Sequence, residues 1–125
     1  MRKLVLISIV VLNLSCLSSV SYAEDCTAPS LSTVELKNCL YKNYQTVDKT
    51  LNQVYQQLMA KLEEANHKKA LKTAQQAWLK YRDAHCEYEV YLNQGGTVYG
   101  AYYTACLTAL TEERVKQLKE SLVNQ

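Results

Sequence analysis

Residues 32–62, which read STVELKNCLYKNYQTVDKTLNQVYQQLMAKL, decide the fold of this chain. Ser32 followed by Glu35 is a capping box, in which each side chain accepts a hydrogen bond from the other residue's backbone N–H at a helix start. Apolar residues then recur every three or four positions, with a tyrosine in the single gap: Leu36, Leu40, Tyr44, Val47, Leu51, Val54, Leu58 and Leu62. This period is typical of an amphipathic helix, and it predicts a helix along the whole stretch.

A second helical stripe follows, and it extends to about Leu92. Its members are Leu71, Ala74, Trp78, Tyr81, His85 and Tyr88. Leu62 and Leu71 are nine residues apart, so on one continuous helix they would lie on opposite faces. Asn66-His67 falls at this discontinuity, and asparagine tolerates the left-handed conformation that ends helices. The sequence therefore predicts an antiparallel helical hairpin that turns within residues 64–68; one long helix with a switched face is the alternative.

The C-terminal third predicts two shorter helices. Gly95-Gly96 ends the second helix, and a third is expected over residues 98–110. Thr111 is interpreted as the N-cap of a fourth helix, because Glu112 and Glu113 would then lie at the positive end of its dipole. No segment has the alternating pattern of a strand. The expected fold is all-α, a disulfide-stapled antiparallel helical hairpin plus two shorter C-terminal helices.

The first 23 residues have the pattern of a signal peptide. Arg2-Lys3 precedes an apolar run over residues 4–14, and Ser21-Tyr22-Ala23 places small side chains where signal peptidase needs them. The run is shorter than the ~20 residues that span a bilayer. We expect cleavage before Glu24 and no transmembrane segment in the mature chain.

The alternative is a lipid anchor on Cys16. Lipoprotein processing prefers an apolar residue, usually leucine, three positions before the acylated cysteine, and Asn13 stands there. We therefore expect an unlipidated protein with one helical domain over residues 24–125. Its expected location is the periplasm or the exterior of the cell.

The charge of the mature chain excludes two classes of partner. The full sequence of 125 residues contains 14 Lys+Arg and 12 Asp+Glu. The signal segment holds two of the basic residues and no acidic one, so 12 of each remain from Glu24 onward. A balanced domain lacks the clustered cations that nucleic acid or an anionic membrane surface requires. We expect neither of these partners.

The cysteine count agrees with export. Four of the five cysteines remain in the mature chain, an even number that predicts two disulfides in an oxidising compartment. Their spacings match no zinc pattern, so we expect no metal. Helices that double back at Gly95-Gly96 would bring Cys86 level with Cys106. A lead-in that folds back would place Cys26 beside Cys39, two turns into the first helix.

A set of polar and aromatic residues is predicted to lie inside the hairpin: Asp48, Asn52, Gln75, Trp78 and Arg82. A turn near residue 66 puts Asp48 almost level with Arg82, whose guanidinium can pair with a carboxylate and stack on Trp78. We interpret the set as a buried ion pair that fixes the register, because buried polar groups need partners. A small-ligand pocket around Trp78 and Arg82 is the alternative.

The segment from Leu71 to Arg114 carries a specific set of motifs. It contains Gln75-x-Ala77-Trp78-x-x-Tyr81-Arg82-Asp83-x-x-Cys86, then Gly95-Gly96, Cys106 and Leu110-Thr111-x-x-Arg114. Together with Cys39, Asp48, Leu51-Asn52 and Tyr55, this pattern resembles the lysozyme inhibitor LprI family over residues 26–118. The resemblance implies a small exported bacterial helical domain, and the named family member is a lysozyme-inhibiting lipoprotein. This chain departs from that member because it lacks a lipoprotein cleavage motif.

Catalysis is not expected. The only histidines are His67, interpreted as a solvated turn residue, and His85, interpreted as a packed core residue. The chain has no nucleophile elbow, phosphate-binding glycine loop or metalloprotease motif. The acid pairs Glu63-Glu64 and Glu112-Glu113 point to different sides of their helices and do not form a glycosidase dyad. We predict a non-enzyme without cofactors.

The predicted partner is a protein, with a lysozyme as the leading hypothesis. The loop with Gly95, Gly96 and Tyr99 is one candidate contact, because the Cys86–Cys106 disulfide would hold its base. Asp83 and Glu87, one turn apart, are the other candidate, since acids suit a basic target. A structural or stress-related envelope domain and a small-ligand binder are the alternatives. We expect a monomer.

Overall fold

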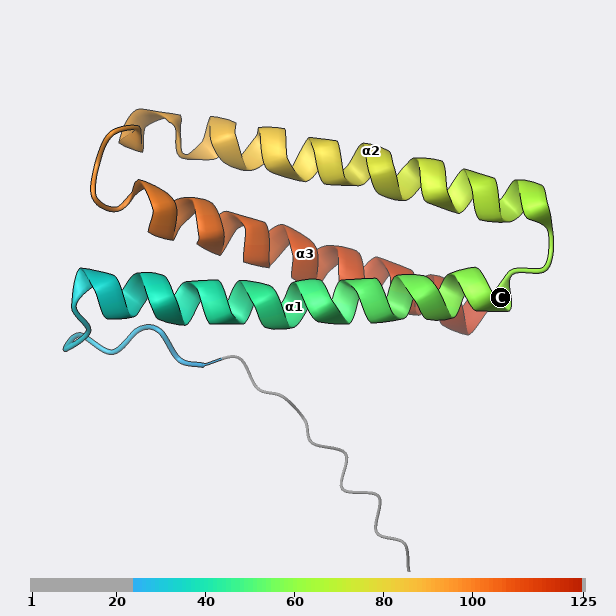
Figure 1. Cartoon of the computed structure of the whole chain (residues 1–125), viewed down its shortest axis with the longest axis horizontal. Coiled ribbons are helices and arrows are strands. Elements are labelled where there is room, and N and C mark those ends of the chain that lie inside the picture. Colours follow the sequence, from blue (N-terminus) through green and yellow to red (C-terminus); the bar gives the residue numbers. More distant parts are fainter. Residues whose placement is uncertain (1–23, 125) are drawn as a thin grey trace, which may run out of the picture.

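The computed structural model describes residues 24–124 and consists of three long helices (Figure 1). They are α1 (Thr33–Lys61), α2 (Ala65–Glu89) and α3 (Tyr99–Asn124), with a short 3-10 helix, η1 (Tyr91–Asn93), after α2. No strand occurs within residues 24–124, which confirms the all-α prediction. The expected signal peptide lies outside the described residues.

The predicted capping box starts α1. The Ser32 hydroxyl accepts a hydrogen bond from the Glu35 backbone N–H at 3.3 Å, and the Ser32 N–H donates to the Glu35 carboxylate at 2.8 Å. The predicted Cys26–Cys39 disulfide, with the Cα atoms 5.8 Å apart, holds the lead-in against this part of α1. Helix and lead-in therefore form one unit at the N-terminal end.

The turn between α1 and α2 lies earlier than predicted. It comprises residues 62–64, whereas Asn66-His67 belongs to the first turn of α2. Leu62 and Glu64 have extended backbones, and no residue other than glycine has a positive φ within residues 24–124. The Leu62 side chain is buried although the helix has ended at Lys61, so the turn stays anchored to the core. A left-handed asparagine is not needed.

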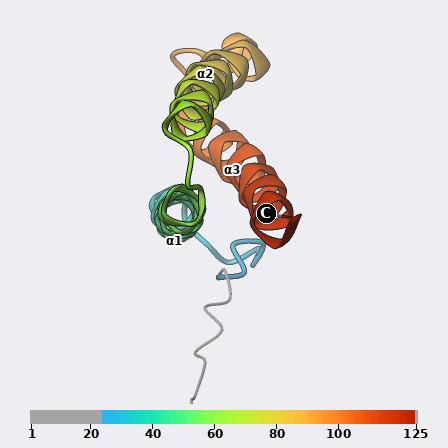
Figure 2. The ribbon, with the colours of Figure 1, turned by 90° about the vertical axis from the view of Figure 1, so that its right-hand side faces the viewer.

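The main helix interface differs from the predicted hairpin. α1 and α2 run in opposite directions, but α1 packs mainly on α3, and α3 also contacts α2 (Figure 2). The apolar core lies between α1 and α3, where it consists of Leu51, Val54, Leu58, Val115 and Leu118. Leu71 and Trp78 of α2 pack against this core from its edge, so the first two helices meet through a core that α3 shares and not through a seam of their own.

The buried face of α2 is rotated from the predicted stripe. Gln75, Arg82 and Cys86 are buried, whereas Tyr81 and Tyr88 of the stripe are 55% and 75% exposed. The helical period is as predicted, but tyrosine has a polar end that suits the surface. Cys86 is instead fully buried, because it forms the disulfide with Cys106. Arg82 lies one turn earlier on the same face of α2 and is therefore buried as well.

The two predicted C-terminal helices are one helix. Thr111 lies in the middle of α3, fully buried, and its hydroxyl donates to the Leu107 carbonyl at 2.6 Å. A threonine that bonds to the preceding turn can continue a helix. The N-cap interpretation is therefore wrong, and Glu112 and Glu113 are exposed residues within the helix.

The α2–α3 connection is held at its base by the second predicted disulfide. Cys86 and Cys106 have Cα atoms 5.7 Å apart. α2 ends at Glu89, before the predicted Leu92, and Val90 is buried beneath η1. Gly95 has a φ of +78°, the left-handed conformation that glycine adopts without strain. This glycine turns the chain toward α3.

Removal of the Cys86–Cys106 disulfide is expected to destabilise the protein more than removal of Cys26–Cys39. The two close loops of similar length, 20 and 13 residues, so chain entropy gives each about 3 kcal/mol. The Cys86→Ala/Cys106→Ala variant also loses the buried packing of Cys86, whereas Cys26 lies in the partly exposed lead-in. Urea unfolding of the two double variants measures the difference. Equal losses would contradict it.

Candidate functional site

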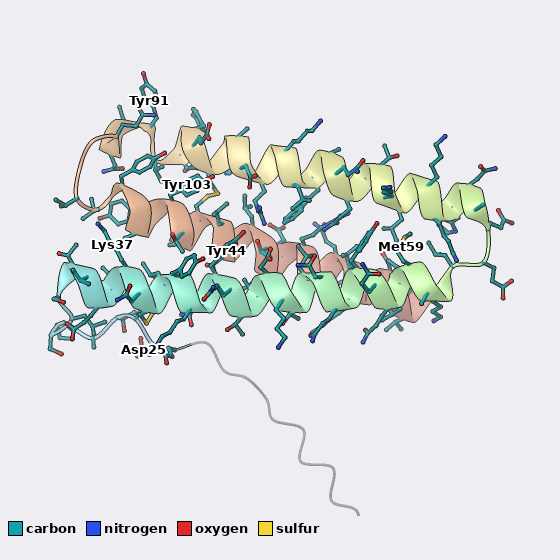
Figure 3. All side chains as sticks on the ribbon, viewed as in Figure 1. Asp25, Lys37, Tyr44, Met59, Tyr91 and Tyr103 are labelled. Carbon is teal, nitrogen blue, oxygen red and sulfur yellow. A yellow bond between two sulfur atoms is a disulfide. The ribbon has the colours of Figure 1, made fainter. Side chains whose placement is uncertain are left out.

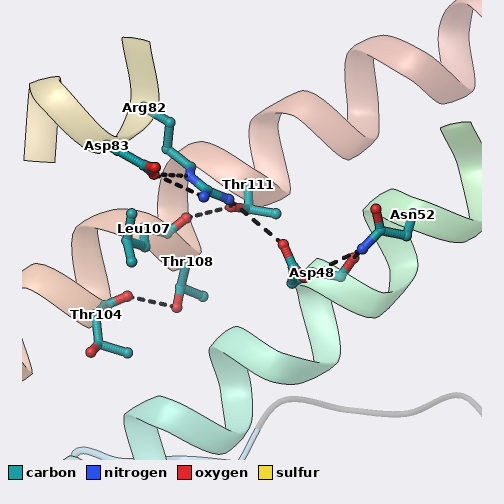
Figure 4. Close-up of polar contacts among 8 residues, drawn as sticks. All are labelled: Asp48, Asn52, Arg82, Asp83, Thr104, Leu107, Thr108 and Thr111. Atoms are coloured by element: carbon teal, nitrogen blue, oxygen red, sulfur yellow. Dashed lines mark hydrogen bonds and ion pairs between the residues drawn. The ribbon is translucent and has the colours of Figure 1, made fainter. Parts of the chain in front are cut away.

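A buried arginine, Arg82, links the three helices (Figure 4). It is 7% exposed, and its Nε and Nη2 atoms both donate to Asp83 Oδ1 at 2.8 Å. Its Nη1 atom lies 3.6 Å from Asp48 Oδ1 on α1 and donates to the Thr111 hydroxyl on α3 at 3.5 Å. Each side of the guanidinium therefore meets a partner from a different helix.

The predicted Asp48–Arg82 pair is present, but it is not the shortest ion pair. Asp83 is the closer partner of Arg82, and its position next to Arg82 in the sequence did not indicate this ion pair. Asn52 donates from Nδ2 to the Asp48 backbone carbonyl at 3.0 Å and to Asp48 Oδ2 at 3.3 Å. Asn52 therefore orients the carboxylate that faces Arg82. Asp83, predicted as a free acid for a partner protein, instead balances an internal cation.

Aromatic rings flank the same cation. The Arg82 guanidinium lies 5.4 Å from the Trp78 ring centroid and 5.7 Å from that of Tyr44, distances at which a cation and a ring attract. Arg114 of α3 lies 5.8 Å from the Trp78 centroid, and its Nε donates to Gln75 Oε1 at 3.0 Å. The predicted Trp78 and Gln75 thus join α2 to α3.

Four members of this network were not predicted to belong to it: Tyr44, Asp83, Thr111 and Arg114. Thr111 and Arg114 do lie in the quoted motif, which was the available signal, but Thr111 was interpreted as a cap. We call the full set the arginine network: Tyr44, Asp48, Asn52, Gln75, Trp78, Arg82, Asp83, Thr111 and Arg114.

The surroundings of the network shift the pKa of two of its members, Tyr44 and Arg114. Burial raises the pKa of Tyr44 above its ordinary value, and the carboxylates of Asp48 and Asp83 raise it further, against the opposing charge of Arg82. Burial also lowers the pKa of Arg114. The raised pKa means that the Tyr44 phenol keeps its proton to a higher pH than an exposed tyrosine does.

The network satisfies its own polar groups. Within residues 24–124, no buried side-chain nitrogen or oxygen lacks a hydrogen-bond partner. In the same part of the chain, no cluster of three or more His, Cys, Asp or Glu side chains is arranged to hold a metal ion. The geometry therefore supports the structural interpretation, a polar interior that fixes how the helices align.

An open groove runs along α1 beside the network. Its cavity of about 970 Å³ is lined mainly by amides and tyrosines of α1, namely Tyr41, Tyr44, Gln45, Asn52, Gln53 and Gln56. A smaller cavity of about 210 Å³ adjoins it at Asp48 and is also lined by Gln75 and Gln76 of α2. Figure 3 shows Tyr44 extending from α1 toward the space between the helices. Arg82 is buried and lines neither cavity.

The loop that carries the predicted partner contacts is exposed, but its most exposed side chains were not among those predicted contacts. Leu92 is 95% exposed and Tyr91 lies beside it, also exposed. Tyr99, a predicted contact, is half-buried and stacks on Tyr103 with the ring centroids 6.1 Å apart. The predicted Glu87 is exposed on the neighbouring part of α2.

The unpredicted rotation of α2 leaves an aromatic row on its surface. The rings of Tyr81 and Tyr88 lie 5.4 Å and 6.5 Å from the His85 ring, measured between centroids. His85 is half-exposed, with Nε2 3.7 Å from Glu89 Oε1, so its interpretation as a packed core histidine is wrong. His67, interpreted as a turn residue, is exposed within α2.

Comparison with known proteins places the chain near one family. The family model described as "Lysozyme inhibitor LprI" matches residues 24–118. An uncharacterized protein of Rhizobium meliloti (strain 1021) is 29% identical over 119 residues, an alignment that covers 76% of this chain and 86% of that protein. No solved structure matches the chain significantly. The matched span contains the whole arginine network and both disulfides.

Replacing Arg82 is expected to destabilise the fold without abolishing it. Arg82→Met leaves Asp48 and Asp83 without their cation, and we expect a loss of about 2 kcal/mol. This is below the ~3–5 kcal/mol of a fully buried pair because both carboxylates remain partly exposed to water. Urea unfolding measures the loss, with the exposed Lys80→Met as the matched control.

Double-mutant cycles separate the two partners. Asp83→Asn and Asp48→Asn, each combined with Arg82→Met, should both lose less stability than the sum of the single variants. The coupling should be larger for Asp83, because its distance to Arg82 is 2.8 Å against 3.6 Å for Asp48. Additive losses at both positions would show that neither ion pair contributes to stability.

Alkaline pH is expected to weaken the fold through Tyr44. Burial gives Tyr44 a pKa above its ordinary value of 10.0, so the folded state keeps the phenol proton that the unfolded chain releases. Stability therefore falls as pH rises past about 10. In Tyr44→Phe the thermal midpoint should fall less over this range than in the parent. Tyr88→Phe, at the surface, is the control; an equal effect of both variants would contradict the assignment.

Proposed function

The chain belongs to the LprI family of lysozyme inhibitors, and we propose that it acts outside the cytoplasm as a lysozyme inhibitor without enzymatic activity. The main support for this proposal is the family match over residues 24–118, which begins at the expected cleavage site. Two disulfides support an oxidising compartment. No helix in residues 24–124 has the length and apolar character to cross a bilayer.

We place the contact with the target in the segment between α2 and α3, residues 90–98. It presents Tyr91 and Leu92 to solvent, and an exposed apolar tip suits insertion into a concave partner. The Cys86–Cys106 disulfide and the buried Val90 hold its base. A loop fixed in this way loses little conformational freedom on binding, which favours affinity.

The charge around this loop fits the cleft of a glycoside hydrolase. Such clefts carry two catalytic carboxylates, and an acidic probe would be repelled from them. Residues 90–111 contain no charged side chain, so the loop can approach the carboxylates without repulsion. Glu87 and Glu89, exposed at its base, would instead meet the basic rim of the enzyme.

The neutral domain limits the role of long-range attraction. With 12 basic and 12 acidic residues from Glu24 onward, it has no overall field to steer it toward a basic enzyme. Affinity must then come from close contact at the loop. We propose a monomer that binds one enzyme molecule.

A lysis assay with purified disulfide-bonded protein tests this function. We expect protection of bacterial cell walls from chicken-type or goose-type lysozyme at micromolar protein, weakened by roughly tenfold or more in Leu92→Asp. Val123→Asp is the matched control, because Val123 is also exposed but lies at the far end of α3. Protection should change little with salt. If the protein protects cell walls against neither chicken-type nor goose-type lysozyme, the inhibitor proposal is refuted and a structural role in the envelope remains.

A further inference from the structure

The aromatic row on α2 borders a small cavity between α2 and α3, which we call the α2–α3 cavity. Its volume is about 370 Å³, and its lining includes His85, Glu89, Val90, Asn93, Tyr102 and Leu110. The remaining lining residues, Cys106 and Ala109, are uncharged. Tyr102 is exposed, and Tyr81 and Tyr88 are exposed one turn before and one turn after His85. Exposed tyrosines therefore border a shallow concave site beside the loop.

The charge of the domain is balanced in total but divided along the chain. Residues 65–82 contain five basic residues and no acidic one, whereas residues 83–113 contain five acidic residues and no lysine or arginine. The α2–α3 cavity and the whole loop belong to the second stretch. The surface at this end of the molecule therefore complements a cationic group.

Glu89 is the carboxylate of the cavity, and it has no permanent cation. Within residues 24–124 its one ion-pair partner is His85, whose Nε2 lies 3.7 Å from Glu89 Oε1 and is charged only when protonated. Glu89 also ends α2, where the helix dipole disfavours a negative charge, and the last turn holds no basic residue. The side chain therefore does not stabilise its own helix, and its half-exposed carboxylate is available to a cation from outside.

The rest of the lining favours an arginine side chain among the cations. Val90 and Leu110 offer apolar contacts to a methylene stem, and the Tyr102 ring offers a face on which a guanidinium can stack. Asn93 adds a side-chain carbonyl as an acceptor besides the Glu89 carboxylate. The planar guanidinium carries five N–H donors in a fork, so it can stack and donate at the same time, whereas an ammonium is a point charge.

Other ligands fit less well. A phosphate or carboxylate would meet Glu89 and no lysine or arginine, and an acyl chain would take water from Glu89 and Asn93 without replacing their hydrogen bonds. We propose that the α2–α3 cavity binds an arginine side chain on the rim of the target enzyme's cleft. This rests on the proposed inhibitor function. Leu92, next to Asn93, would enter the cleft while the cavity holds the rim, which narrows the targets to enzymes with an arginine at that place.

Amide NMR titration with N-acetylarginine amide tests the cavity directly, at about pH 8, where histidine is neutral. We expect saturable shifts at millimolar ligand, centred on Glu89, Asn93 and Tyr102. N-acetyllysine amide should bind more weakly, and N-acetylcitrulline amide, which has the shape of arginine without its charge, should not bind. Glu89→Gln should weaken arginine binding about fivefold. Glu87→Gln, at an exposed acid outside the cavity, is the matched control and should bind like the parent.

The lysis assay then connects the cavity to the enzyme. Glu89→Gln should weaken protection of cell walls about fivefold, because the arginine on the rim loses its carboxylate. Glu120→Gln, at an exposed acid in the C-terminal part of α3, is the control and should protect like the parent. Leu92→Asp should lose protection and still bind N-acetylarginine amide, since Leu92 does not line the cavity.

The outcomes separate this site from the inhibitor function. Saturable arginine binding together with weaker protection by Glu89→Gln supports the proposal. Absence of saturable shifts, or equal shifts with the citrulline compound, overturns it even if the parent inhibits lysozyme. Unchanged protection by Glu89→Gln also overturns it, and the inhibitor function then stands without the cavity. If the parent gives no protection, the inhibitor function fails by itself, and the titration alone decides whether the cavity is an arginine site.

Discussion

The buried guanidinium of Arg82 is the constraint on which the arrangement of the three helices depends. An interior cation is tolerated only when partners surround it, because its desolvation costs several kcal/mol. Its partners come from all three helices: Asp48 from α1, Asp83 from α2 and Thr111 from α3. These contacts coexist only at one rotation of α2 and one alignment of α1 with α3. The network thus specifies a register more than it adds net stability.

Placing a polar face of α2 inward has consequences for the rest of the molecule. The apolar core must form between α1 and α3, and α2 is joined to them by the Cys86–Cys106 disulfide, the Arg82 contacts and the stacked Trp78. The side of α2 that an apolar packing would have buried carries Tyr81 and Tyr88 on the surface instead.

Features set by local chemistry and chain reach could be predicted from the sequence, as could the pairing of Asp48 with Arg82, whereas the rotation of α2 and the continuity of α3 could not. The Ser32 capping box, the course of α1 and both disulfides follow from spacing and chain reach. The rotation of α2 does not, because tyrosine counts as apolar in a periodicity although its hydroxyl suits the surface. A threonine such as Thr111 can either cap a helix or lie buried within one. Here the contact with Arg82 of α2 accompanies the buried position, and the sequence around Thr111 does not show this contact.

The position of the network also separates the interior motif residues from the loop that we propose contacts the target. The motif residues Gln75, Trp78, Arg82, Asp83 and Cys86 face the interior or complete its ion pairs, so matching this motif means sharing the helix register. Arg82 lies one turn before Cys86, and Cys86 anchors the loop between α2 and α3, so the register also fixes where this loop is presented. Tyr91 and Leu92 lie outside the motif and point to solvent. On the proposed function, substitutions at Tyr91 and Leu92 can therefore change the target contact while the arginine network that positions the loop stays intact.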